Sequence, residues 1–157
     1  MKISITRLVS TVILAASLQS CASTSSVANK ITVESGEIPP DMKSEDFTLI
    51  GVLKERGSYD KYVKIAFANY TGKYVLATEN EIKDKYNDTN QYRYIMDYER
   101  ETASLTVVGS GKSQTVPGKR YFILDRKTDK EYKRKTWSSF YTKEMQAYLK
   151  AIEAVKN

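Results

Sequence analysis

The chain has 157 residues, with 25 basic and 19 acidic side chains, no histidine and a single cysteine. That length suits one domain rather than two. The lack of histidine excludes the Ser-His-Asp and Cys-His catalytic arrangements, and one cysteine allows neither an internal disulfide nor a zinc site of the usual kind. A carboxylate site for calcium or magnesium stays open, but the sequence contains no Asp-rich ligand loop.

The first twenty residues have the organisation of an export signal. A positively charged start is followed by an apolar run from Leu8 to Leu18, far shorter than the roughly 20 residues that cross a bilayer. Leu18-Gln19-Ser20-Cys21 is similar to the lipobox of bacterial lipoproteins, in which an aliphatic residue precedes an obligatory cysteine. We therefore expect residues 1–20 to be cleaved as a signal peptide and Cys21 to be lipidated, rather than a plain secretory signal or an uncleaved anchor.

Cleavage would remove Lys2 and Arg7, which lowers the 25 basic residues to 23 against 19 acidic ones, a net charge of +4. So mild a charge suits solubility near anionic envelope polymers better than nucleic-acid binding. Residues 21–40 are rich in serine, threonine and small side chains and end in Pro39-Pro40. We expect them to form the lipidated cysteine and a flexible tether of roughly 25 Å. An edge strand at Ile31-Thr32-Val33 is the alternative.

Residues 41–157 are predicted to form one domain that starts with a βαβ unit. Phe47 to Leu53 is apolar at successive positions, which is typical of a central strand with both faces covered. Apolar side chains then recur with the helical period from Tyr59 through Tyr62 to Tyr70. Lys73 to Ala77 is predicted to be a second strand, parallel to the first because a helix connects them.

The rest of the domain is predicted from alternation, turn signals and one helical stripe. The elements expected in chain order are a short helix over 79–86, strands over 92–98 and 104–108, a polar glycine-rich link to Gly118, and paired strands over 121–124 and 132–137. The closing helix carries an apolar stripe made of Tyr141, Met145, Tyr148, Leu149, Ile152 and Val155. This order predicts an α/β (α+β) fold: a single mixed β-sheet of about five to six strands, with the N-terminal βαβ unit and a C-terminal amphipathic helix packed on the sheet.

Gly109-Ser110-Gly111-Lys112-Ser113 looks like the end of a phosphate-binding P-loop. The complete motif needs a glycine where this chain has Thr106. The residues that follow, 114–118, contain proline and glycine and cannot begin the helix whose N-terminus would hold the phosphates. A hairpin loop is the interpretation that we favour.

Paired carboxylates could hydrolyse a glycan, and the candidates are Asp97, Glu99, Glu101 and Asp125. That chemistry needs two carboxyl groups roughly 5 to 9.5 Å apart across a cleft. On strands, such residues more often form ion pairs on the solvent side, which is the interpretation that we favour. The 12 tyrosines could likewise form a glycan- or peptide-binding face. We favour the simpler explanation that they fill half-buried sheet positions.

Residues 126–135 contain six basic and two acidic side chains. Lys133, Arg134 and Lys135 are the candidate binding surface for anionic lipid or an acidic partner. The alternative is an exposed hairpin tip, since Asp129 and Glu131 interrupt the basic run.

From about Pro40 onward, the chain resembles a family of small bacterial envelope lipoproteins. The resemblance depends on three short motifs, which are Tyr92-Arg93-Tyr94, Asp125-Arg126-Lys127-Thr128 with Tyr132, and Ser138-Ser139-Phe140-Tyr141. More remotely, the element order is similar to the α/β domain of the curli-secretion lipoprotein and the N-terminal domain of the Tol-system periplasmic protein. The resemblance implies a mixed sheet and an envelope role through protein contacts, and it carries over no catalytic residue. The sequence shows no obvious pore-forming hairpin, so a secretion channel does not follow.

The sequence therefore favours a non-catalytic, lipid-anchored envelope protein that acts as a binding or assembly module without a cofactor. We expect it at the outer membrane facing the periplasm, attached through Cys21, with another envelope protein rather than nucleic acid as its partner. The alternative is a glycan- or small-ligand-binding lipoprotein, followed by a carboxylate-based envelope hydrolase.

Overall fold

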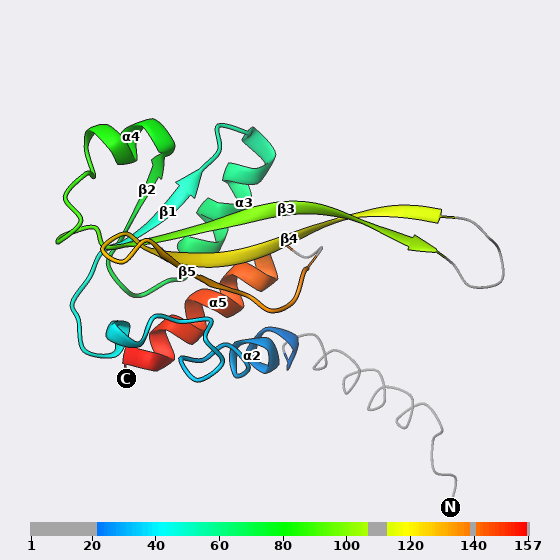
Figure 1. Cartoon of the computed structure of the whole chain (residues 1–157), viewed down its shortest axis with the longest axis horizontal. Helices are drawn as coiled ribbons and strands as arrows, with labels where there is room; N and C mark the ends of the chain where they lie inside the picture. The colour runs from blue at the N-terminus through cyan, green and yellow to red at the C-terminus, as the bar shows by residue number, and fades with distance from the viewer. Residues whose placement is uncertain (1–21, 107–112, 139–140, 157) are drawn as a thin grey trace, which may run out of the picture.

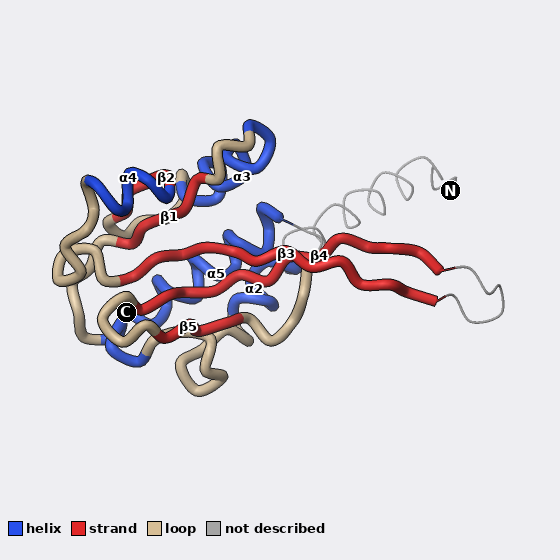
Figure 2. The backbone as a smooth tube through the Cα atoms, turned by 45° about the horizontal axis from the view of Figure 1, so that its top comes forward, coloured by secondary structure: helices blue, strands red, loops and turns tan. Residues whose placement is uncertain are grey.

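The computed structural model describes residues 22–106, 113–138 and 141–156. Its centre is one mixed sheet with the strand order β2-β1-β3-β4-β5 (Figures 1 and 2). β1 pairs in parallel with β2 and with β3, whereas β4 is antiparallel to both of its neighbours. The strands are β1 (Leu49–Leu53), β2 (Tyr74–Thr78), β3 (Tyr94–Thr106), β4 (Ser113–Asp125) and β5 (Lys130–Lys133). The predicted α+β class with a single mixed sheet is confirmed.

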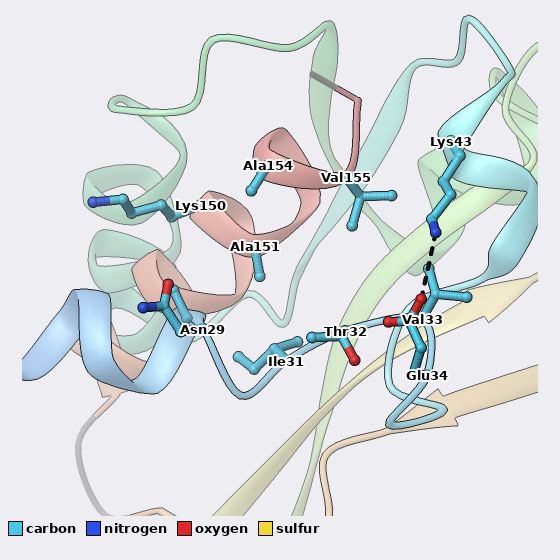
Figure 3. A pocket seen from close by; sticks show the side chains of 11 residues that line it. Asn29, Ile31, Thr32, Val33, Glu34, Lys43, Lys150, Ala151, Ala154 and Val155 are labelled. Atoms are coloured by element: carbon cyan, nitrogen blue, oxygen red, sulfur yellow. Dashed lines mark hydrogen bonds and ion pairs between the residues drawn. The ribbon is translucent and has the colours of Figure 1, made fainter.

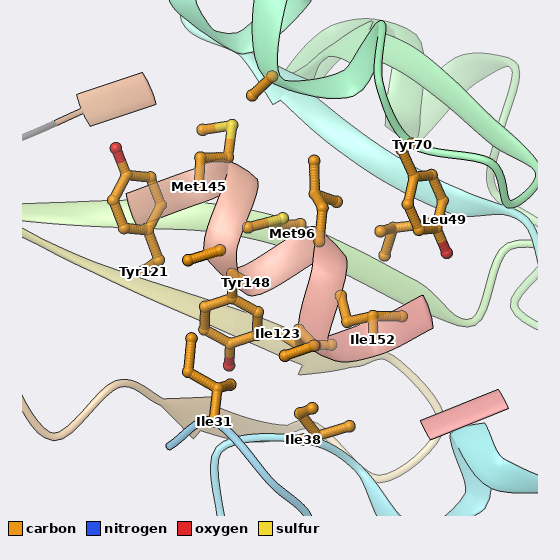
Figure 4. Packing of buried hydrophobic residues seen from close by; sticks show 14 of the residues in the cluster. Ile31, Ile38, Leu49, Tyr70, Met96, Tyr121, Ile123, Met145, Tyr148 and Ile152 are labelled. Carbon is orange, nitrogen blue, oxygen red and sulfur yellow. The ribbon is translucent and has the colours of Figure 1, made fainter. Parts of the chain in front are cut away.

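Helices cover the two faces of the sheet unequally (Figure 1). They are α2 (Ala22–Ala28), α3 (Gly57–Phe67), α4 (Glu79–Asp84) and α5 (Tyr141–Lys156), with a short 3-10 turn, η2 (Pro40–Lys43). The larger core lies under α3 and α5, where Leu49, Met96 and Ile123 of the sheet meet Tyr148 and Ile152 of α5 (Figure 4). The predicted C-terminal amphipathic helix is therefore confirmed on the sheet, although the side chain of Tyr141 lies outside the described residues.

A second, smaller core lies under α4 on the opposite face. It contains Ile50 and Val52 of β1 together with Ile82 of α4. Because successive strand side chains point to opposite faces, Leu49 enters the first core while Ile50 enters the second. This placement explains why β1 is apolar at successive positions, as the sequence predicted for a central strand.

Two local features fix the helices near β1. Gly51 lets α3 approach closely, since a β-carbon there would lie 2.6 Å from Cε2 of Phe67. α4 starts with a capping box in which Thr78 and Glu81 satisfy each other's backbone N–H groups. One predicted core position of α3 is wrong: Tyr62 is 42% exposed, because the buried face of the helix is made by Val63, Ala66 and Phe67.

β3 and β4 form one long hairpin in place of the shorter strands expected from the sequence. Each strand has 13 residues, and the register runs without a break from Tyr94 opposite Asp125 to Thr106 opposite Ser113. The hairpin extends well beyond the other strands (Figures 1 and 2). The expected link up to Gly118 is therefore wrong, since strand β4 already begins at Ser113. Residues 107–112, which hold most of the P-loop-like sequence, lie outside the described residues.

The segment from Ala22 to Pro40 is packed against the body, so the expected flexible tether is wrong for the described part of residues 21–40. Ile31 and Ile38 are 2% and 0% exposed and belong to the main core. A hydrogen-bonded turn between Thr32 and Ser35 replaces the alternative edge strand. The segment contains few apolar residues among its serines and threonines, yet these apolar residues are buried in the core. Composition alone therefore did not predict that the segment packs.

An ionic cluster in the interior holds this segment in place. Arg134 of the residues after β5 donates to Glu37 and to Glu144 of α5, each at 2.8 Å, and all three side chains are at most 10% exposed. Tyr148, which also belongs to α5, donates a hydrogen bond from its hydroxyl to the backbone carbonyl of Glu37. A second cluster joins Arg93 to Asp125 and to the η2 region. The N-terminal segment is thereby fastened to β5 and α5 by groups that are shielded from water.

We predict that Glu37→Ala lowers the free energy of unfolding by roughly 3–5 kcal/mol, because it leaves the Arg134 charge inside with one of its two carboxylates missing. Glu34→Ala is the matched control in the same segment, since that side chain is 75% exposed; it should change stability by no more than about 0.5 kcal/mol. Urea unfolding of the mature chain measures both. Equal effects of the two substitutions would contradict the packed segment.

Candidate functional site

The sequence-predicted anchor is not part of the described structure. Residues 1–20 and Cys21 lie outside the described residues, which begin at Ala22. None of the helices in the described part of the chain combines the length and the apolar character that crossing a membrane requires. Signal cleavage and lipidation at Cys21 thus stay predictions from the sequence.

Lys133, Arg134 and Lys135 do not form one exposed basic surface. The backbone continues the alternation of β5 past Lys133, so Tyr132 and Arg134 point inward while Lys135 is exposed. The Arg134 guanidinium is engaged in its two buried ion pairs. The Lys133 ammonium lies 3.2 Å from Glu99 and 2.7 Å from Glu131. The predicted binding surface is therefore wrong as a group, because its central member is a core residue.

The four candidate carboxylates have separate environments. Asp125 is 2% exposed and accepts two hydrogen bonds from Arg93, which hold its pKa below the usual value. Glu99 pairs with Arg120 and Lys133 on the outer face of the sheet. Glu101 is exposed on the hairpin. Glu99 and Glu101 match the solvent-side positions expected of strand carboxylates, whereas the ion pair of Asp125 is buried. Asp97 binds Lys54, which lines a cavity.

That cavity is a recess of about 330 Å³ at the carboxyl ends of β1 and β2, lined by Lys54, Arg56, Glu79, Tyr98 and Arg100. Chain segments following two parallel strands meet here, together with the neighbouring strand β3. Open α/β sheets commonly bind ligands at this edge. We call this group of residues, with Tyr59 and Lys119 behind it, the basic recess.

Lys54 organises one wall of the basic recess. Its ammonium lies 2.7 Å from Asp97 and 3.0 Å from Glu79, and its backbone N–H donates to Asp60 in the first turn of α3. Burial opposes the charged form of Lys54, but the hydrogen bonds with both carboxylates raise its pKa. For Asp97, burial is the larger effect, so its pKa is raised despite the neighbouring ammonium.

Arg100 and the Tyr98 ring line the opposite wall, and Lys119 and the Tyr59 ring lie next to them outside the lining. Arg100 and Lys119 are directly opposite each other in the β3–β4 register. Both lie over the ring of Tyr59, with Arg100 Cζ 4.0 Å and Lys119 Nζ 3.8 Å from its centroid, and Lys119 also lies 4.2 Å from the Tyr98 centroid. Burial, followed by repulsion from Arg100, lowers the pKa of Lys119 to about 7. Tyrosine faces are favourable neighbours for these cations.

A larger cavity of about 450 Å³ lies between the N-terminal segment and α5 (Figure 3). Its walls are mainly apolar, with Ile31 and Val33 on one side and Ala151 and Val155 on the other. The polar groups at its edge include Lys43, which pairs with Glu34 at 3.5 Å (Figure 3). Apolar residues make up about half of the groove lining, whereas every residue that lines the recess carries a polar group, so we take the recess as the candidate site.

Most of the tyrosines are structural, as expected. Tyr94, Tyr121 and Tyr148 are at most 1% exposed, and Tyr148 hydrogen-bonds two backbone carbonyls. Sequence reasoning missed Arg56, Arg100 and Lys119, because these residues meet only once the β3–β4 register is known. The available signal for this register was the alternation of side chains along both strands of the hairpin. The glycine-rich stretch between the strands obscured it, because it was taken to be a longer link.

Comparison of the chain with family models, with curated proteins and with solved structures finds no match. Within residues 22–106, 113–138 and 141–156, no three Asp, Glu, Cys or His side chains gather as they would around a metal ion.

We predict that Lys119 titrates with a midpoint near pH 7, because burial and Arg100 disfavour its charged form. An ordinary lysine titrates near pH 10.4. NMR of ¹³C-labelled lysine side chains followed from pH 5 to 11 measures the midpoint, and the spectrum of Lys119→Gln assigns the signal. A midpoint above pH 10 would show that the amine is well solvated and that the recess is more open than described.

Proposed function

We propose that this chain is a lipid-anchored protein of the cell envelope that acts as a non-catalytic binding module through its basic recess. The anchor is Cys21, and the expected location is the outer membrane, facing the periplasm. The observation that carries the binding role is the convergence of three cations, Lys54, Arg56 and Arg100, with the Tyr98 ring on the wall of one recess. Such a small set of convergent polar groups in a concave site is typical of ligand recognition.

The position of α2 supports an anchor held close to the body. α2 begins at Ala22, directly after Cys21, and packs against α5, with Lys150 donating to Ser25 at 3.0 Å. Figure 1 shows α2 below the sheet beside α5 and α4 above the sheet.

The arrangement of carboxylates supports binding rather than acid–base chemistry. Asp97 and Glu79 both hold the ammonium of Lys54, and Asp60 accepts the Lys54 backbone N–H. A general acid or base needs a carboxyl group that can reach the substrate and exchange its proton. These three carboxylates instead position a cation.

A carboxylate-based hydrolase is the second candidate, favoured by one observation. The raised pKa of Asp97 beside a recess that also contains Glu79 is a property of catalytic acids. In the binding module that we propose, the same shift is a consequence of burying the side chain next to Lys54. Substitution of Asp97 separates the two functions.

The anchor is tested at its sequence signal. We predict that Cys21→Ser abolishes lipid attachment and leaves the precursor unprocessed, because the thiol is the acyl acceptor that the lipobox requires. Intact-mass analysis of the membrane fraction measures acyl mass and cleavage together, with Ser20→Ala as the control that keeps the cysteine. A mature wild-type protein without acyl mass on Cys21 would contradict the proposal.

The binding role is tested with Asp97→Asn in cells that show a defect without the protein. We predict that this variant keeps its function at normal abundance, whereas Arg100→Gln loses it, because the first change keeps the shape of the recess and the second removes a cation that faces the ligand. Removal of a true catalytic acid typically costs 10²–10⁴ in rate. Loss of function in a stable Asp97→Asn protein would favour the hydrolase.

A further inference from the structure

The two edges of the sheet differ in how they are protected from pairing with another chain. β5, at one edge, has charged side chains at three of its four positions, which are Lys130, Glu131 and Lys133. Just beyond β5, the backbone N–H of Lys135 donates to Glu37 of the N-terminal segment. Charged side chains and a covering segment are common means of keeping an edge strand from pairing with a further strand.

β2, at the opposite edge, has neither kind of protection. Its five residues, Tyr74–Thr78, include no charged side chain and no proline. Tyr74 contacts Phe67 of α3 on one face, and Ala77 packs with Ile82 of α4 on the other. These helices cover the faces of β2, but β2 is the last strand on its side of the sheet that the structure describes. An uncharged edge of this kind is suited to pairing with another strand.

The backbone of β2 has hydrogen-bonding groups that face away from β1. The N–H of Leu49 in β1 donates to the carbonyl of Lys73, so every second residue from Lys73 onward turns its backbone groups toward β1. Tyr74 and Leu76, which lie between them, turn theirs outward, where no hydrogen bond joins them to another described residue. The N–H of Thr78 also points outward but is satisfied by the capping box of α4. The groups of Tyr74 and Leu76 are left for solvent or for a further strand.

The residues around β2 are complementary to a second copy of the same strand. If two copies pair antiparallel about a two-fold axis at Leu76, then Tyr74 is opposite Thr78 of the second copy. The same symmetry places Lys73 opposite Glu79, two side chains of opposite charge that are 67% and 64% exposed. Each already has an ion-pair partner in its own chain, so the new contact extends existing pairs. Exposed ion pairs add little stability, but unlike charges directly opposite each other favour one register over the others.

We propose that this chain forms a dimer in which β2 of one copy pairs antiparallel with β2 of a second copy, so that the two sheets join into one. The inference goes beyond the proposed function and does not depend on the basic recess. The two-fold axis of such a pair is perpendicular to the sheet, so both copies present the same face to the same side. Because α2, α3 and α5 all belong to the main core on one face, both α2 helices lie on that side, where both expected anchors can reach one membrane.

The test is disulfide crosslinking of the full-length lipoprotein in its own membranes, with Lys73→Cys and Glu79→Cys combined in one chain. In the proposed register these positions form a non-hydrogen-bonded pair, whose Cα atoms are about 4.5 Å apart and within reach of a disulfide. Within one chain, the two positions are separated by roughly 20 Å of nearly extended backbone, which a disulfide cannot span. Mild oxidation should therefore give a covalent dimer of the double variant.

The single variants fix the register. Lys73→Cys alone and Glu79→Cys alone should stay monomeric, because each position is roughly 20 Å from its own copy across the two-fold axis. The wild type, whose single cysteine is Cys21, should also stay monomeric. Both substituted side chains are exposed, so the variants should fold, which circular dichroism checks. No covalent dimer of the double variant, or a dimer from either single variant, would overturn the proposed pairing.

A second arm tests the strand edge in the double-cysteine background. Tyr74→Lys gives β2 the kind of charge that protects β5, and it should lower the yield of covalent dimer by about tenfold. Trp137→Lys is the matched control, because both aromatic side chains are 38% exposed and Trp137 lies beyond β5 at the far edge. It should crosslink as its parent does. An unchanged yield with Tyr74→Lys, or an equal loss with Trp137→Lys, would overturn the β2 edge as the interface.

Discussion

The Arg134 cluster joins three parts of the chain that are far apart in the sequence. Its guanidinium binds Glu37 from the N-terminal segment and Glu144 from α5, and it projects from the end of β5. Removing one partner from such a buried ion pair is strongly destabilising, because the remaining charge cannot be solvated. The cluster therefore requires the segment before β1 to stay in place. Ile31 and Ile38 of the same segment form part of the main core.

Because the N-terminal segment is held in place, it limits how far the domain can move from its expected anchor at Cys21. A flexible tether would let the domain rotate and move roughly 25 Å from the membrane. With α2 packed on α5, Cys21 instead directly precedes a fixed helix. The residues that line the basic recess, at the carboxyl ends of β1 and β2, belong to neither α2 nor α5.

The parts of the fold that are set by local patterns could be predicted from the sequence. β1 is apolar at successive positions because it lies between two cores, and the stripe of α5 places Met145, Tyr148 and Ile152 against the sheet. The outcomes that depend on distant pairing could not be predicted. From its place in a basic run, Arg134 is expected on the surface, but the structure shows it bonded to the distant Glu37. Arg100 is opposite Lys119 only in the hairpin register that the structure shows. The basic recess is built entirely from such distant pairings.

Amide hydrogen exchange of the mature lipoprotein tests the packed N-terminal segment most directly. Residues 30–45 contain amides bonded within the segment, such as Ile31 to Ala28 and Glu37 to Thr32, and they cover the main core. We predict that peptides from 30–45 are protected to a similar extent as those from α5, and much more than the exposed turn at 87–91. Exchange of 30–45 at the rate of an unstructured chain would contradict the fastening by Arg134, and with it the fixed orientation of the basic recess.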